Sequence, residues 1–154
     1  LDGYPGVEHA IPIFPLYKDV TKTIAESKMA HTPTLLVAYG GPWAENYYYT
    51  TESPLKDPKL NRFTPYEELN GKARRRTGGN GGWFTPEDHV FQKHAQGSNS
   101  MVQQGGLVGV GSHGQLQGLG YHWELWSVAS GGMSPLNALK TATILGATAL
   151  GLDK

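Results

Sequence analysis

The sequence predicts an α/β fold, a partial TIM barrel with about three parallel strands and flanking helices. Short apolar runs rich in β-branched residues alternate with segments of helical spacing, an order typical of parallel sheets. The 154 residues are too few for a closed eight-stranded barrel, which needs about 250 residues. Three strands leave two apolar edges, so we expect the partial barrel to be completed by the missing barrel part or to form a homo-oligomer.

The composition indicates one folded segment covering residues 1–154, with 38% hydrophobic and 17% charged residues. Thirteen basic residues balance thirteen acidic ones, so neither nucleic acid nor a membrane is an expected partner. No apolar run approaches the roughly 18–20 residues that cross a bilayer. The absence of cysteine excludes thiolate metal sites, so any metal must use histidine and carboxylate. The start at Leu1 rather than Met suggests a processed, truncated or excised piece.

The first elements are predicted from local periodicity. Residues 6–10 form a short strand candidate, and residues 17–27 form an amphipathic helix because Tyr17, Val20 and Ile24 recur at helical spacing. Residues 32–38 are a continuous apolar, β-branched run, which predicts a second strand buried on both faces.

Residues 39–85 are predicted to be a long loop insertion, interrupted by a short helix near residues 65–75. Turn residues and aromatic residues dominate this segment, and loops of such length are usually functional. Trp43 and the tyrosines at 47–49 either line a substrate pocket or pack the loop onto the barrel, and packing is favoured.

The C-terminal half is predicted to contain three helices and one strand. Thr85 followed by Pro86 starts a helix over residues 85–104, and residues 107–111 form the third strand. Helices are expected over residues 121–130 and 134–150, and Ser134 caps the second of them. The apolar residues of that last helix are expected to face the core: Leu136, Leu139, Ala142, Thr143 and Leu150.

Two short motifs resemble known signatures, but the residues around them do not fit those signatures. Gly109-x-Gly111-x-x-Gly114 matches the dinucleotide fingerprint formally, but no helix is predicted to start on the third glycine and no further strand follows. His122-Trp123-Glu124 resembles part of a zinc deaminase signature, which requires two cysteines that this chain lacks.

The histidines carry the strongest chemical prediction. His9 and His113 each fall at the C-terminal end of a predicted parallel strand, where α/β folds place their chemistry. Two imidazoles converging there could hold a divalent cation; alternatively, they are ordinary polar residues that close a strand. His31, at the start of its strand, is expected to be exposed or to cap it. His122 is placed near the same mouth, for substrate contact or for packing. Ser112 beside His113 offers a weaker alternative, a serine-type hydrolase.

Four segments then resemble the amidohydrolase superfamily, especially imidazolonepropionase-like and prolidase-like enzymes, some of which are fused to a TolB-like propeller. Residues 6–9 resemble the sixth barrel strand, residues 32–37 the seventh and residues 108–114 the eighth. Residues 132–143, Gly-Met-Ser-Pro-Leu-Asn-Ala-Leu-Lys-Thr-Ala-Thr, resemble the helix that follows and are the most specific match. The segments at 43–49 and 116–126 are similar to the propeller-fused branch.

The resemblance implies metal-dependent hydrolysis of C–N bonds, in amides or cyclic amides, of a small-molecule or peptide-like substrate. It implies His9 as a metal ligand, a divalent metal with zinc as first candidate, and His122 near the substrate. His113 stands where the family has an aspartate, so it is expected to act as metal ligand or as catalytic base. Export or a periplasmic location is implied by the propeller-fused relatives.

The resemblance also implies that the remaining family ligands would precede Leu1. This chain alone is therefore expected to show little activity, and the hydrolase would be that of the full-length parent. The competing interpretation is a non-catalytic structural or interaction module derived from the barrel. Metal dependence of any activity would separate the metallohydrolase from the serine-type alternative.

Overall fold

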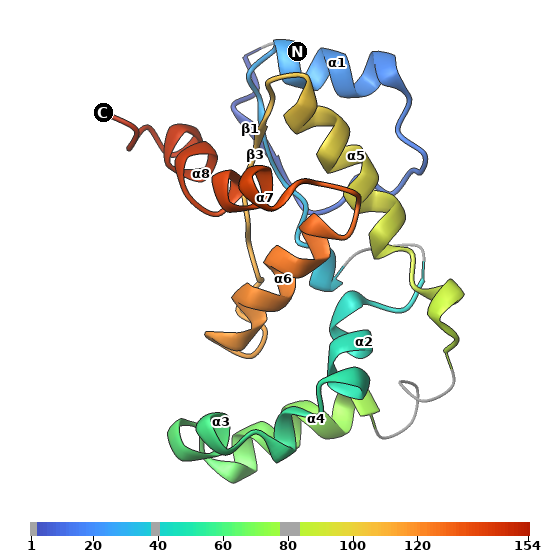
Figure 1. Ribbon diagram of the computed structural model, residues 1–154, viewed down its shortest axis with the longest axis vertical. Helices are drawn as coiled ribbons and strands as arrows, with labels where there is room; N and C mark the ends of the chain where they lie inside the picture. The colour runs from blue at the N-terminus through green and yellow to red at the C-terminus, as the bar shows by residue number, and fades with distance from the viewer. Residues whose placement is uncertain (1–2, 38–40, 78–83) are drawn as a thin grey trace.

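A computed structural model describes residues 3–37, 41–77 and 84–154, except for the side chains of residues 75–77. The chain is a mixed α/β protein built on one three-stranded parallel sheet, in the order β1-β2-β3 (Figure 1). The strands are β1 (Gly6–Glu8), β2 (Ala30–Thr32) and β3 (Leu107–Val108). Val7 pairs with His31, and His31 pairs with Val108, so β2 is the central strand. The predicted α/β class and parallel sheet are confirmed.

Helices flank the sheet on two sides (Figure 1). On one side, α1 (Lys18–Glu26) packs against α5 (Phe91–Gln103), and both belong to the smaller core of the molecule. That core consists of Ile24, Met29, Met101 and Val108. On the other side, α8 (Ile144–Ala149) contacts β3. The predicted helices at 17–27 and 85–104 are found here, the second preceded by a short 3₁₀ turn, η4 (Pro86–Asp88).

The second strand lies earlier than predicted. β2 ends at Thr32, and the apolar run continues as the 3₁₀ turn η1 (Leu35–Val37). Pro33 has no N–H to donate to a neighbouring strand, and Thr34 has a positive φ of 48°, so the extended backbone cannot continue. The prediction for His31 is therefore wrong: it lies in the middle of β2 and is only 2% exposed. Ala38, the end of the predicted strand, lies outside the described residues.

Residues 44–77 are helical where a long loop was predicted. The segment contains α2 (Ala44–Thr51), η2 (Pro54–Lys56), α3 (Pro58–Phe63) and α4 (Tyr66–Thr77). The Asp57 carboxylate accepts the backbone N–H of Leu60 at 2.7 Å and caps α3. Burial of Tyr48 and Tyr49 holds α2 against the larger core. The short helix predicted near residues 65–75 is present as α4, and the glycine-rich residues 78–82 lie outside the described part of the chain.

The last predicted helix is divided into α7 (Pro135–Thr141) and α8. Ser134 Oγ accepts the backbone N–H of Asn137 at 3.3 Å, which confirms the predicted cap. The predicted core face is wrong, because Leu136 and Leu139 are 64% and 56% exposed. Ala138 and Thr141 are buried instead, so the buried stripe of α7 lies on its other side.

The larger core surrounds Trp123 of α6 (Leu119–Ala129). The Trp123 ring stacks on Tyr48 with centroids 5.4 Å apart and contacts Tyr49 edge-on at 5.2 Å. The tyrosines at 48 and 49 thus pack rather than line a pocket. Across residues 3–37, 41–77 and 84–154, we find no helix with the length and hydrophobicity to span a membrane.

Candidate functional site

His9 and His113 meet at the carboxyl edge of the sheet. His9 directly follows β1, and His113 follows β3 after four residues. Their ring centroids are 5.3 Å apart, with the ring planes inclined at 59°. Strands two positions apart in a sheet are separated by about 10 Å, so the two rings converge across the end of β2. The structure therefore brings together the two histidines that the strand-end pattern selected.

The backbone at both histidines has a left-handed conformation. The φ angles are 69° at His9 and 57° at His113, which is uncommon for residues other than glycine. The backbone N–H of His9 donates to the carbonyl oxygen of Thr32 at 2.7 Å, and this bond fixes the chain where it leaves β1. Strained conformations of this kind persist when surrounding contacts hold them, and they concentrate at functional sites.

His31 supports His9 from the central strand. Its Nε2 lies 3.2 Å from the carbonyl oxygen of His9. A carbonyl oxygen only accepts, so Nε2 carries the hydrogen and Nδ1 does not. Burial lowers the pKa of His31 to about 4, against the opposing effect of the His9 hydrogen bond, so the ring is neutral near pH 7. Its Nδ1 is buried and has no hydrogen-bond partner among the described residues.

The donor chemistry of the pair suits a divalent metal, because neutral imidazole is a good ligand for zinc. The number of donors is smaller than catalytic zinc requires, since three protein ligands are usual. Within the part of the chain that the structure describes, no three histidine or acidic side chains come together as a metal-binding group.

His122 and Ser112 occupy different surroundings. His122 is exposed on the first turns of α6, and its ring neighbours are Tyr121 and Trp126, at 6.3 and 6.5 Å. Ser112 is half-buried, and its carbonyl oxygen accepts the N–H of Gln115. Among the described residues, no hydrogen bond joins the Ser112 hydroxyl to a histidine.

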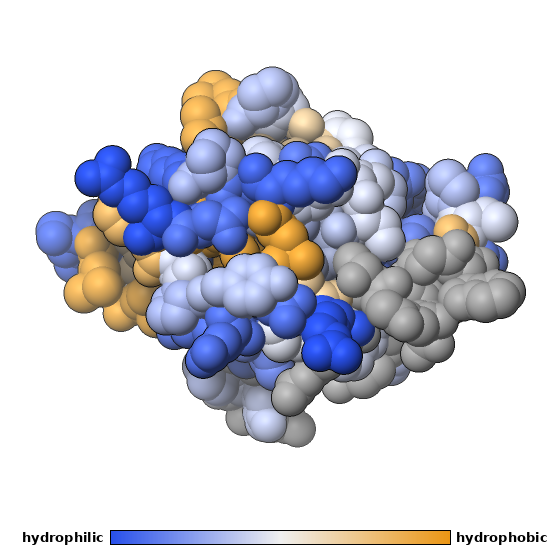
Figure 2. Space-filling model, turned by 90° about the horizontal axis from the view of Figure 1, so that it is seen from below, coloured by the Kyte–Doolittle hydropathy of each residue, from blue (hydrophilic) through white to orange (hydrophobic). Residues whose placement is uncertain are grey.

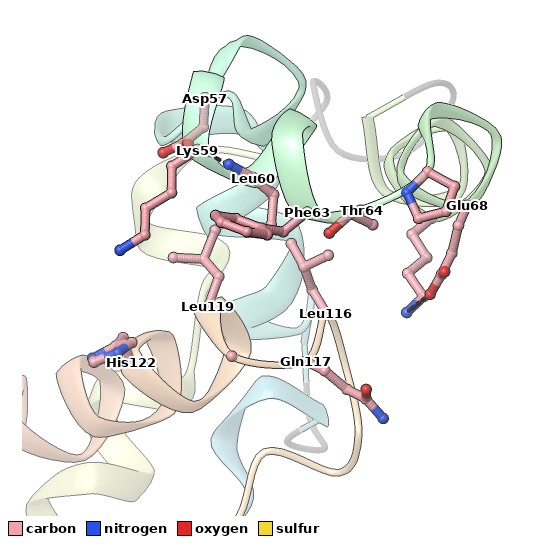
Figure 3. Close-up of a pocket in the computed structure, with 13 residues that line it drawn as sticks. Asp57, Lys59, Leu60, Phe63, Thr64, Glu68, Leu116, Gln117, Leu119 and His122 are labelled. Carbon is pink, nitrogen blue, oxygen red and sulfur yellow. Dashed lines mark hydrogen bonds and ion pairs between the residues drawn. The ribbon is translucent and has the colours of Figure 1, made fainter.

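His122 lines a cavity of about 500 Å³ between two parts of the chain (Figure 3). One wall comes from α3 and the start of α4, and the other comes from residues 116–119 and α6. Apolar and charged side chains both line this cavity, which we call the α3–α6 groove. Its leucines and phenylalanine are Leu60, Phe63, Leu116 and Leu119.

Glu124 is a buried acid that the sequence interpretation missed. Its two carboxylate oxygens accept the backbone N–H groups of Leu35 and Leu36 at 2.7 and 2.9 Å. Burial raises the pKa of Glu124 to about 7, although these two hydrogen bonds act in the opposite direction. The signal in the sequence is a single acid within the otherwise uncharged helix at residues 119–129.

The glycines after β3 allow close approach of the backbone. The N–H of Gly109 donates to the carbonyl oxygen of His31 at 3.0 Å, which continues the β2–β3 pairing. A Cβ on Gly111 would lie 2.6 Å from Cγ2 of Thr32. No helix begins at Gly114, so the segment lacks the turn-to-helix geometry of a dinucleotide fingerprint.

Comparison with protein-family models, curated proteins and solved structures finds no match to this chain. The structure defines the protein as a mixed α/β chain with a parallel sheet and a histidine pair at the carboxyl edge of that sheet.

Proposed function

We propose that this chain is the C-terminal part of a TIM-barrel, amidohydrolase-like protein whose full-length parent hydrolyses C–N bonds of amides or cyclic amides with a divalent metal, zinc being the first candidate. The observation that supports the proposal is the 5.3 Å approach of the His9 and His113 rings. They meet at the edge where parallel α/β folds carry their chemistry.

In this proposal His9 is a metal ligand, and His113 is a second ligand or the base that removes a proton from water. A zinc ion, when bound, supplies a lowered pKa for a bound water and polarises the substrate carbonyl. His31 is a positioning residue because it holds the carbonyl of His9. The role of His122 is contact with a small-molecule or peptide-like substrate.

The proposed site needs further ligands, because two imidazoles fall short of three. They would come from the missing barrel part or from a second copy of this chain, associating at the free edges of β1 and β3. The isolated chain is accordingly expected to show little hydrolysis.

Zinc titration by calorimetry tests the proposal at pH 7.5. We expect wild-type chain to bind zinc, and His9→Ala and His113→Ala each to weaken binding by at least tenfold. His122→Ala is the matched control and should bind zinc as wild type does. Equal zinc affinity in wild type and both alanine variants would overturn the proposal, as would the absence of zinc binding. Native mass spectrometry on the same samples reports whether binding accompanies oligomer formation.

A second candidate function is a non-catalytic interaction module. The observation that favours it is the exposed apolar surface of the C-terminal helices, where Leu136, Leu139 and Leu150 are all exposed. Assembly that needs no metal and is lost in a Leu136→Asp, Leu139→Asp double variant would support this function over the first.

A further inference from the structure

The α3–α6 groove has the size of a small-molecule site. Its volume of about 500 Å³ lies within the roughly 300–1,000 Å³ typical of ligand pockets. Figure 2 shows this end of the molecule, where a small group of hydrophobic side chains is surrounded by hydrophilic ones. Such an arrangement suits a ligand with an apolar body and a polar end.

The centre of the groove is apolar. Figure 3 shows Leu60, Phe63, Leu116 and Leu119 between the charged side chains at its two sides. Phe63 is 73% exposed, so most of its ring is open to a ligand, and the Arg62 guanidinium lies over the ring with Cζ 5.6 Å from the centroid. Leu116 is buried and gives the groove a fixed floor.

One oxygen of each carboxylate in the groove has a partner. Asp57 accepts the N–H of Leu60 as the cap of α3, and Glu68 pairs with Lys72 at 3.0 Å. The ammonium group of Lys59 makes neither an ion pair nor a hydrogen bond within residues 3–37, 41–77 and 84–154. Figure 3 shows Lys59 and His122 on the same side of the view, and Glu68 on the opposite side. The Asp57 carboxylate is drawn on that side too, so this end of the groove presents a lysine ammonium without an ion pair, one carboxylate that caps α3, and an imidazole.

We propose that the α3–α6 groove binds a small monocarboxylate with an apolar, preferably aromatic, body. Lys59 pairs with the carboxylate, His122 donates a ring N–H to it, and Phe63 contacts the apolar body. Two lysines and two acids line the groove, and the Lys59 ammonium is the one of the two lysine ammonium groups without a direct ion-pair partner among the described residues, so a ligand carboxylate would supply that partner.

The groove adjoins the histidine pair along the chain. Leu116 follows His113 by three residues, so their Cα atoms are at most about 11 Å apart. Binding of the carboxylate does not rest on the proposed metal chemistry, since neither His9 nor His113 lines the groove. The two proposals can consequently fail separately.

Calorimetry with 4-phenylbutyrate and its neutral amide tests the groove in buffer with a chelator. We expect the acid to bind wild type about tenfold more tightly than the amide, the value of one charge-assisted hydrogen bond. Lys59→Gln should reduce the affinity for the acid to that for the amide. Phe63→Ser should weaken the binding of the acid and of the amide alike. Lys140→Gln, on α7 and outside the groove, is the matched control and should bind as wild type does.

Equal affinity of wild type for acid and amide would overturn the proposal, as would an unchanged acid affinity in Lys59→Gln or the absence of binding to wild type. Circular dichroism of each variant confirms that it is folded before titration. His9→Ala and His113→Ala should retain the full affinity for 4-phenylbutyrate. Retained probe binding together with absent zinc binding would sink the metal proposal alone.

Discussion

The Nε2–H of His31 donates to the carbonyl oxygen of His9 across 3.2 Å, and this bond joins the central strand to the edge of the sheet. The donor is held neutral by burial, and the acceptor belongs to a residue with a strained backbone. Removing the donor would leave the His9 carbonyl oxygen without this partner. The backbone at His9 would then be held less firmly, and the orientation of the His9 ring would be less fixed.

We predict that His31→Leu weakens zinc binding by about tenfold, a loss typical when a supporting hydrogen bond near a metal ligand is removed. His31→Gln retains an N–H donor of similar reach and should restore most of the affinity. Calorimetric titration of both variants measures the difference. If leucine and glutamine at position 31 give the same zinc affinity, the hydrogen bond does not position His9.

Glu124→Gln is predicted to change how stability depends on pH. The pKa of Glu124 rises from 4.5 to about 7 on folding, so the folded protein keeps a proton that the unfolded chain releases. The contribution of Glu124 to the free energy of unfolding therefore falls by about 3 kcal/mol as the pH rises from 4.5 to 7. Glutamine cannot ionise, so between pH 4.5 and 7 the unfolding free energy of this variant, measured in urea, should rise by about 3 kcal/mol relative to that of wild type.

The matched control for Glu124→Gln is Glu67→Gln, an exposed acid on α4. Its unfolding free energy should follow wild type at both pH values. A Glu124→Gln profile that also follows wild type would contradict the assignment of the titration to Glu124.

His31 is predicted to contribute the opposite pH dependence. Its pKa falls from 6.5 to about 4 on folding, so between these values the unfolded chain holds the extra proton. The contribution of His31 to the free energy of unfolding then rises by about 3 kcal/mol from pH 4 to 6.5, and the lowered pKa of His89 acts in the same direction. Because Glu124 and His31 oppose each other, wild type should vary little while His31→Gln loses stability as the pH rises. If the unfolding free energy of His31→Gln varies with pH as little as that of wild type, Glu124 and His31 do not have opposite effects on stability.

Trp123→Ala is predicted to destabilise the fold by about 3–5 kcal/mol, because it empties the centre of the larger core. Trp126→Ala on the same helix is the control, since Trp126 is 46% exposed and should cost about 1 kcal/mol. Chemical denaturation followed by circular dichroism compares the two. Similar losses would mean that the stacking of Tyr48 on Trp123 does not organise the core.

Two glycine variants should have opposite effects. A Cβ on Gly131 would overlap the backbone of Ala95, so Gly131→Ala should force α5 and α6 apart at a cost of about 1–3 kcal/mol. A Cβ on Gly71 would meet nothing within 4 Å, and Gly71→Ala in α4 should stabilise by about 0.5–1 kcal/mol. Thermal unfolding of both variants measures the sign of each change. A Gly131→Ala variant that melts like wild type would contradict the close packing.

Apolar spacing and capping residues correctly predicted the elements that are stabilised by interactions between residues close in the sequence. The helix at Lys18–Glu26 follows from apolar spacing, and the caps at Thr85 and Ser134 follow from residue type. The meeting of His9 with His113 was predictable from strand ends, because parallel strands end at the same edge.

The features that the sequence did not predict depend on contacts between residues that are far apart in the sequence. A run such as Leu35–Val37 fits a buried strand as well as a buried 3₁₀ turn, and the carboxylate that selects the turn lies 89 residues from Leu35, on Glu124. The predicted loop at 39–85 resulted from turn residues that in fact separate short capped helices, such as the one that Asp57 begins. The burial of His31 depends equally on neighbours that no local pattern displays.

The strand order has a consequence for the sequence of folding events. β1 and β2 are joined by a short connection through α1, whereas β2 and β3 pair only after residues 33–106 have been brought back to the sheet. Closing the longer connection costs more chain entropy, so we expect β3 to dock last. The hydrogen bond between His31 and His9 then forms early, and the His9–His113 pair forms with the final strand. The contact between His9 and His113 therefore indicates that folding is complete. It forms later than the pairing of β1 with β2, which supports His9.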